Sequence, residues 1–195
     1  TIPTEIGNLS LLAFTRWFDN RFDTTLPTEV GQLQKVREFW MFNMGVRGTI
    51  PTEIGKMTDL DVTRLEANLL EGTIPDELFN ARKMSTLYLH NNNLVGTLST
   101  NVEQMVDLQQ LTVKFNSLTG AIPTEFESLE KLWRLWIYKN DFEGAVPPGI
   151  CNLQYLKLTD LIADCAKTNL INPPKNQCDC CRKCCDSANG GVCSD

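Results

Sequence analysis

Apolar residues recur along the chain at fixed places within a unit of 24 residues. The units begin at Thr1, Thr25, Thr49, Thr73, Thr97, Ala121 and Ala145, and positions 2, 6, 12, 17 and 22 of all seven units are apolar. A strict period of this length is typical of a solenoid, in which a single unit is too small to bury its apolar face and stacks on its neighbours. The pattern therefore predicts one elongated array with a continuous core.

Polar positions of the unit predict how the chain turns. Position 20 is an asparagine column, whose amide can both donate to and accept from backbone groups where the chain leaves a strand. Met44 interrupts this column and predicts a looser second turn, with Asn43 as a candidate substitute. Glycine at position 24 suits a turn with positive φ. The column consists of Asn20, Asn68, Asn92, Asn116, Asn140 and, in the last unit, Asp164.

Two further stretches of the unit have a predicted conformation. Positions 4 to 11 begin with Thr or Asp before Glu in most units, which predicts a short helical turn on the outer side. Positions 14 to 18 are expected to form a strand. Its residues 15 and 17 point into the core and its residues 14, 16 and 18 point outward, by the two-residue alternation of a strand.

The consensus L-x-x-L-x-L-x-x-N-x-L-x-G-x-[IL]-P resembles the plant-type leucine-rich repeat over residues 1–168. The resemblance implies a curved and twisted leucine-rich repeat solenoid. A parallel β-sheet lines its concave face, and short helical or 3-10 turns lie on the convex side. Such solenoids occur in extracellular receptor domains and secreted inhibitors. The resemblance also implies that a cap and a signal peptide preceded Thr1.

A cysteine-rich remainder, residues 169–195, follows the seven repeats and is expected to cap the array. A lid this small needs covalent staples, which favours disulfides and an oxidising compartment. The spacing C-x-C-C-x-x-C-C leaves a thiolate metal cluster as the alternative, although two cysteines lie well outside it. The eight candidates for disulfides are Cys151, Cys165, Cys178, Cys180, Cys181, Cys184, Cys185 and Cys193. With the L-x-A-D-C segment before it, this end resembles the caps of secreted leucine-rich repeat proteins of diatoms, which implies a secreted or cell-surface location.

Charge and motif content exclude several classes of function. The net charge is −6, and no basic cluster is present, which argues against nucleic-acid binding. No apolar run reaches the 18 or more residues of a membrane span. We find no phosphate-binding loop and no His-based metal motif, so no cofactor or metal is predicted. The single histidine, His90, has no nucleophile and orienting group beside it, so the chain is predicted not to be an enzyme.

Aromatic residues are concentrated at the outward strand positions. They occupy seven of the 21 positions, although aromatic residues make up 8% of the chain. Trp40 is expected between Arg16 and Arg64, with Phe18 beside Phe42, because neighbouring strands lie about 4.8 Å apart. The predicted ligand-binding residues of the concave face are Phe14, Arg16, Phe18, Trp40, Phe42, Arg64, Glu66, Tyr88, His90, Arg134, Trp136 and Tyr138.

Aromatic and arginine anchors dominate protein interfaces, so we expect an extracellular protein or peptide partner. Adhesion, sensing and inhibition of a secreted enzyme are the activities that fit. The alternatives are polysaccharide binding, in which the rings stack on sugars, and a structural role in a cell wall or matrix. The rings could also serve only to stabilise the sheet. Asn8 starts an Asn8-Leu9-Ser10 sequon and is a candidate for glycosylation.

Overall fold

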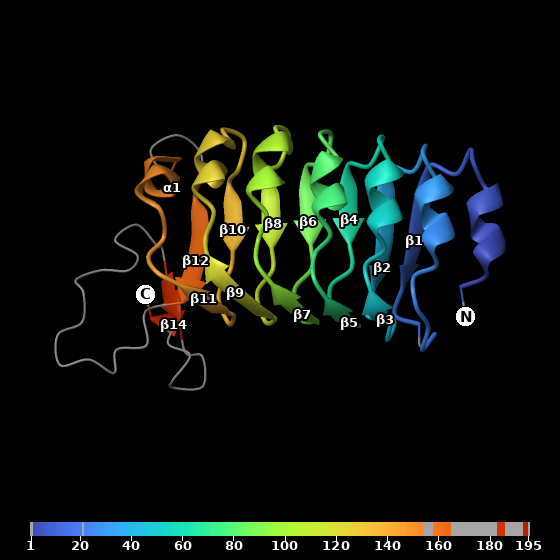
Figure 1. The fold of residues 1–195 in the computed structure, drawn as a ribbon, viewed down its shortest axis with the longest axis horizontal. Coiled ribbons are helices and arrows are strands. Elements are labelled where there is room, and N and C mark those ends of the chain that lie inside the picture. The colour runs from blue at the N-terminus through green and yellow to red at the C-terminus, as the bar shows by residue number, and fades with distance from the viewer. Residues whose placement is uncertain (1, 21, 154–157, 165–182, 186–192, 195) are drawn as a thin grey trace.

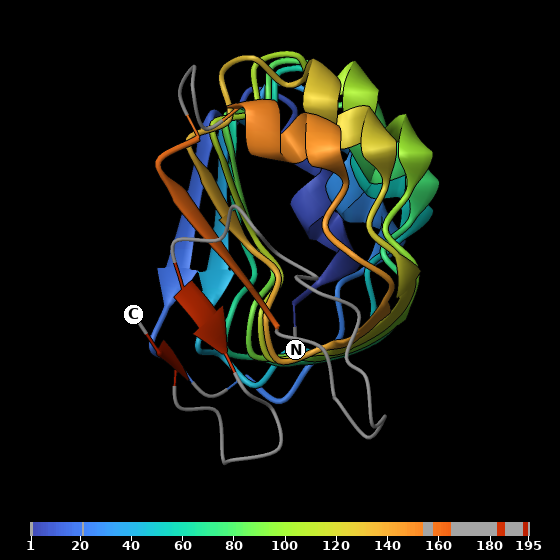
Figure 2. The same ribbon diagram turned by 90° about the vertical axis from the view of Figure 1, so that its left-hand side faces the viewer.

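Each unit contributes one strand to a parallel sheet and one short helical turn to the opposite side of the molecule (Figures 1 and 2). The computed structural model describes the chain except residues 1, 21, 154–157, 165–182, 186–192 and 195. The units stack into an elongated solenoid along the horizontal axis of Figure 1. The predicted architecture of repeated strands and turns is therefore confirmed.

Two sheets run along the solenoid. The nine-stranded sheet is ordered β1-β2-β4-β6-β8-β10-β12-β13-β14, and the five-stranded sheet is ordered β11-β9-β7-β5-β3. The larger sheet comprises β1 (Phe14–Phe18), β2 (Glu38–Phe42), β4 (Val62–Arg64), β6 (Thr86–Tyr88), β8 (Gln110–Thr112), β10 (Arg134–Trp136), β12 (Asp160–Asp164), β13 (Lys183–Cys185) and β14 (Cys193–Ser194). The smaller sheet comprises β3 (Arg47–Thr49), β5 (Leu69–Gly72), β7 (Asn93–Gly96), β9 (Ser117–Ala121) and β11 (Asp141–Glu143).

The helical turns are of the 3-10 type in six units and α-helical in the seventh. Each 3-10 turn follows an extended residue, which is proline in five of the six, and is closed by bonds such as that from the Ile54 amide to the Pro51 carbonyl at 3.1 Å. Turns of this kind stay short because their hydrogen-bond geometry is poor. They are η1 (Thr4–Asn8), η2 (Thr28–Gln32), η3 (Thr52–Lys56), η4 (Asp76–Asn80), η5 (Thr100–Gln104), η6 (Thr124–Ser128) and α1 (Pro148–Leu153).

The core fills the space between the sheet and the turns. Residues at the predicted inward positions, such as Leu65, Leu70 and Ile54, are fully buried. Burial of each such side chain contributes about 1.5 to 3 kcal/mol. Phe22, in the first of the seven units, departs from the prediction and is 41% exposed.

The seventh unit pairs out of step with the others. From β1 to β10, equivalent positions face one another, as in Arg16 and Trp40. In β12, however, Leu161 pairs with Leu135, which is an offset of two positions within the repeat. Leu158, expected to point outward, is instead 1% exposed and belongs to the core.

The asparagine column forms the predicted ladder at Asn68, Asn92, Asn116 and Asn140. The prediction is wrong for Asn20, which is exposed and, among the described residues, donates only to the Phe18 carbonyl of its own unit at 2.8 Å. Asn92 Oδ1 accepts from the Leu70 amide, and Asn92 Nδ2 donates to the carbonyls of Leu65 and Leu89, each at 3.0 Å. At the interruption, the carbonyl of Met44 accepts from the Phe22 amide at 3.0 Å, so backbone replaces side chain.

The prediction that Asn43 replaces the asparagine missing at Met44 is wrong. Asn43 is exposed, and its Nδ2 donates to Asp19 Oδ1 at 2.7 Å. The side chain therefore lies along the surface of the turn and does not enter the ladder.

The C-terminal segment extends the larger sheet. Strand β13 pairs in parallel with β12, and β14 pairs antiparallel with β13. Cys151 in α1 is disulfide-bonded. Cys165, Cys178, Cys180 and Cys181 lie outside the described residues, so the disulfide framework and the boundary between repeats (1–168) and cap (169–195) remain predictions. No helix among the described residues is long and apolar enough to cross a membrane.

Candidate functional site on the concave face

The concave face is the outward side of the sheet from β1 to β12. Burial alternates along the strands as predicted, since Phe39 and Met41 of β2 are fully buried while Glu38, Trp40 and Phe42 are partly exposed. Two outward residues are nevertheless covered by their neighbours. Glu66 is 5% exposed, and Thr112 is 1% exposed.

One end of the concave face carries a stacked layer that we call the Trp40 patch: Arg16, Phe18, Trp40, Phe42 and Arg64. The guanidinium carbons of Arg16 and Arg64 lie 4.7 and 5.4 Å from the Trp40 ring centroid. Phe18 and Phe42 stack with centroids 4.9 Å apart and an interplanar angle of 2°. Both predicted cross-strand arrangements are confirmed, and they follow from the in-step pairing of β1, β2 and β4.

Arg64 is the central residue of this patch. Its guanidinium carbon lies 4.0 Å from the Phe42 centroid and 5.7 Å from the Tyr88 centroid. Its Nε donates to Glu66 Oε1 at 2.8 Å. The ion pair with Arg64 offsets part of the cost of burying the Glu66 carboxylate, whereas Glu66 Oε2 is shielded from solvent with no hydrogen-bond partner among the described residues.

The other end carries the Trp136 patch: Lys114, Phe115, Arg134, Trp136 and Tyr138. Lys114 Nζ lies 4.3 Å from the Trp136 centroid, and the Arg134 guanidinium carbon lies 4.5 Å from it. Phe115 meets Tyr138 edge to face at 5.5 Å. Arg134 Nε donates to Asp160 Oδ2 at 2.8 Å.

Sequence reasoning did not select Lys114 or Phe115 for the site. Lys114 occupies an outward position of the repeat, but Phe115 sits at position 19, just after the strand. Its backbone is left-handed, with φ 54°. This conformation is shared by all the other equivalent residues of the first six units, namely Asp19, Asn43, Ala67, Asn91 and Lys139. Asp and Asn in that column are the available sequence signal for a left-handed turn.

Tyr88 and His90 join the two patches. Tyr88 Oη donates to Gln110 Oε1 at 2.6 Å, and His90 Nδ1 lies 2.7 Å from Thr112 Oγ1. Burial, together with the smaller effects of the Lys114 and Arg64 charges, lowers the pKa of His90 to about 4. His90 is therefore neutral at pH 7, and its ring cannot compete with Lys114 for an anion.

The His90 shift predicts a pH dependence of stability. Between pH 6.5 and about 4 the unfolded chain binds a proton at His90 that the folded chain does not, so the free energy of unfolding falls as the pH falls through this window. With allowance for solvent screening, the loss is about 2 kcal/mol. Urea unfolding at pH 7 and pH 4.5 measures it, with His90→Gln as the control. Equal losses in both chains would contradict the assignment.

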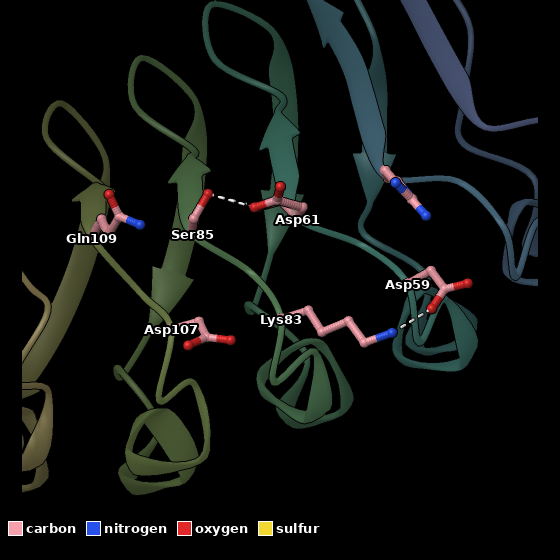
Figure 3. A pocket seen from close by; sticks show the side chains of 7 residues that line it. Asp59, Asp61, Lys83, Ser85, Asp107 and Gln109 are labelled. Carbon is pink, nitrogen blue, oxygen red and sulfur yellow. Dashed lines mark hydrogen bonds and ion pairs between the residues drawn. The ribbon is translucent and has the colours of Figure 1, made fainter.

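A charged groove lies where the strands β4, β6 and β8 begin (Figure 3). It has a volume of about 380 Å³ and is lined by Arg37, Asp59, Asp61, Lys83, Ser85, Asp107 and Gln109. Lys83 Nζ lies 2.6 Å from Asp59 Oδ1, and Ser85 Oγ donates to Asp61 Oδ1. The Lys83 hydrogen bond and charge lower the pKa of Asp59.

Three residues that line the groove, Asp59, Lys83 and Asp107, belong to a row of alternating charges at repeat position 11. The whole row, which we call the charge ladder, is Lys35, Asp59, Lys83, Asp107 and Lys131. Lys35 also pairs with Asp59, and Lys131 pairs with Asp107. The ladder was missed because our sequence reading followed only apolar and outward strand positions, although the alternation is visible in the sequence. Its groups are largely paired with one another, so it is best explained as a surface ion-pair network.

Neither surface assembles a catalytic centre. The outward carboxylates are each held by a cation, since Glu38 pairs with Arg16, Glu66 with Arg64 and Asp160 with Arg134. His90 is hydrogen-bonded to Thr112, and no carboxylate of the described residues is hydrogen-bonded to its ring. Within the described part of the chain, no group of three His, Cys, Asp or Glu residues could hold a metal ion.

No protein-family model and no curated protein sequence matches the chain. Among solved structures, the leucine-rich repeat ectodomain of the Arabidopsis thaliana receptor kinase GASSHO1/SCHENGEN3 superposes with a TM-score of 0.76 and 30% identity, over 78% of this chain and 18% of that chain. The Arabidopsis receptor kinase HAESA superposes with a TM-score of 0.76 and 28% identity, over 84% and 28% of the two chains.

A plant ice-binding protein superposes with a TM-score of 0.65 and 24% identity, over 85% of this chain and 53% of that chain, and shares the fold alone. The chain has the leucine-rich repeat solenoid fold of plant receptor ectodomains. It spans 18% and 28% of the length of the two receptor chains described above.

Proposed function

We propose that the chain is a non-catalytic extracellular recognition module that binds a protein or peptide through the concave face. The observation that carries the proposal is the prearranged layer of cations and rings. Arg16, Trp40 and Arg64 form a continuous stack across three strands, and Phe18 and Phe42 stack beside it. Rigid aromatic and arginine side chains are the usual anchors of protein interfaces, because they bury a large area at a small cost in conformational entropy.

The structural neighbours support the same class of partner. The GASSHO1/SCHENGEN3 ectodomain was solved in complex with Casparian strip integrity factor 2. HAESA was solved with a peptide hormone and a co-receptor. By analogy we place the chain outside the cell, in adhesion, sensing or inhibition of a secreted enzyme. A shared fold does not by itself fix a ligand, so the proposal depends on the concave face.

The geometry favours protein over polysaccharide. A sugar ring needs an open aromatic face to stack on. Arg16 and Arg64 lie against Trp40, and Lys114 and Arg134 lie against Trp136, so the two largest rings are already occupied by cations. Polysaccharide binding and a structural role remain as outcomes of the binding test.

That test is a binding screen of the disulfide-intact chain against extracellular proteins, peptides and polysaccharides from its own source. The double variant Trp40→Ala, Trp136→Ala is expected to lose affinity for the partner at least about 100-fold. A matched control, Leu9→Ala with Val106→Ala, removes exposed apolar side chains away from the concave face and should leave binding within about twofold.

A conservative variant separates lost contacts from lost folding. The indole Nε1 atoms of Trp40 and Trp136 are shielded from solvent and have no hydrogen-bond partner among the described residues. Phenylalanine at both positions therefore keeps a ring and removes no hydrogen bond, and we expect it to restore most of the affinity. Equal binding by the native chain and the alanine double variant would place the site elsewhere. Saturable binding to polysaccharide alone would overturn the protein partner.

We also propose that residues 169–195 cap the repeats through disulfides, with the chain in an oxidising compartment. The disulfide at Cys151 supports this. Alkylation without reductant should label no cysteine, and labelling of most of them would favour the metal-cluster alternative. Asn8 ends η1 at an exposed site and remains the glycosylation candidate.

A further inference from the structure

Phe115 is unfavourable for the folded chain in two ways. Its φ of 54° lies in the left-handed region, which a bulky side chain avoids. The residue is 44% exposed, so a large part of its apolar surface stays in contact with water. The left-handed turn recurs at this position in the first six units, so what sets Phe115 apart is a bulky and partly exposed aromatic ring in that conformation, which makes it a candidate for function.

Lys114 is exceptional in its charge environment. The other cations of the concave face each have a carboxylate partner: Arg16 pairs with Glu38, Arg64 with Glu66 and Arg134 with Asp160. Lys114 forms no ion pair among the described residues. It contacts rings instead, with Nζ at 5.5 Å from the Tyr138 centroid and 5.9 Å from the Phe115 centroid, in addition to Trp136.

Together these residues form a partly enclosed cation. The rings of Phe115, Trp136 and Tyr138 lie against the Lys114 ammonium, and apolar surface beside a charge lowers the local dielectric and strengthens its attraction for an anion. The neighbouring acids offer no competition, because Glu66 and Asp160 are held by their own arginines. A ligand that complements this cation and these rings therefore carries one carboxylate with an apolar group beside it.

We propose that Lys114, Phe115, Trp136 and Tyr138 form a subsite for an acidic side chain of the partner, an Asp or Glu that is flanked by an aromatic or large aliphatic residue. The carboxylate accepts from the Lys114 ammonium, and the flanking side chain packs on the exposed ring of Phe115. This inference deepens the proposed function and rests on it for its biological meaning, although the subsite can be measured without knowing the partner.

The test uses short peptides on the full chain. N-acetyl-Phe-Glu-amide is titrated while the indole N–H signals of the four tryptophans are followed by NMR. We expect a saturable shift of the Trp136 signal, with the Trp40 signal unchanged. N-acetyl-Phe-Gln-amide, which lacks only the charge, should bind at least about tenfold more weakly. N-acetyl-phenylalanine carries a terminal carboxylate in place of a side-chain carboxylate. Tighter binding of this probe than of the Glu peptide would contradict the proposal that the subsite takes an acidic side chain.

Two variants separate the subsite from a merely structural role. Lys114→Met should abolish the preference for Glu over Gln. Phe115→Asn introduces the residue present at the equivalent positions 43 and 91, so it is expected to raise the unfolding temperature and at the same time to weaken the Glu peptide about fivefold or more. If Phe115→Asn lowers both the unfolding temperature and the affinity for the Glu peptide, Phe115 has a structural role and the proposed contact with the ligand is wrong.

The outcomes for the subsite and for the proposed function are separable. No shift of Trp136 up to the solubility limit, or equal binding of the Glu and Gln peptides, overturns the subsite. A Glu preference that depends on Lys114 supports the subsite even when the extracellular screen returns no partner, a result that would overturn only the proposed function.

Discussion

Replacing Asn92 by alanine is expected to lower the free energy of unfolding by about 3 to 4 kcal/mol. Asn92 is 8% exposed, and its amide serves three backbone groups, the amide of Leu70 and the carbonyls of Leu65 and Leu89. The variant leaves the Leu70 amide without a partner in an interior where water is scarce, and it removes one of the two asparagine donors from each carbonyl, since Asn68 still donates to Leu65 and Asn116 to Leu89. Urea unfolding followed by circular dichroism measures the loss.

A neighbouring asparagine provides the control. Asn93 is exposed on β7, and Asn93→Ala is expected to change stability by less than about 0.5 kcal/mol. Similar small effects of both substitutions would show that the ladder is not a major source of stability.

Replacing Arg64 by alanine is expected to cost about 3 kcal/mol, far more than a surface ion pair. The Glu66 side chain is 6% exposed, and Arg64 is its partner. Without the guanidinium, the Glu66 carboxylate remains buried and has no ion-pair partner among the described residues. Thermal and urea unfolding both report the change.

Two companion variants test this reasoning. Arg16→Ala removes the equivalent cation from an exposed pair, with 51% and 21% of the Arg16 and Glu38 side chains accessible, and should cost less than about 1 kcal/mol. Glu66→Leu in the Arg64→Ala background should recover most of the stability, because it removes the orphaned charge. No recovery would assign the loss to ring packing instead.

The repeat pattern predicted the strands, the turns and the asparagine ladder because those features depend on which side chains enter the core. Sequence also placed Trp40 between two arginines, since in-step pairing of equivalent positions determines the neighbours across strands. It failed for Leu158, because the pairing of β12 is offset by two and the repeat alignment assumes constant spacing. It failed for Asn43 because the backbone of Met44 supplies the missing acceptor.

The chemistry of the face was harder to predict than its composition. Burial of Glu66 depends on the path that Arg64 takes across Phe42, which a column of outward positions does not show. The isolation of Lys114 depends on each neighbouring acid being held by another cation. Phe115 was overlooked because its column was not examined for left-handed backbone. Such features depend on which side chains pair with each other. The repeat period shows only whether a side chain points inward or outward.

Photocrosslinking tests the central claim, that the concave face is the binding surface, most directly. A photoreactive benzoylphenylalanine is placed singly at Phe18 and Tyr138 on the concave face, and at Leu9 and Val106 away from it. Each chain is irradiated with the partner from the binding screen. We predict covalent adducts from positions 18 and 138 and none from positions 9 and 106. Adducts confined to positions 9 and 106 would contradict the account.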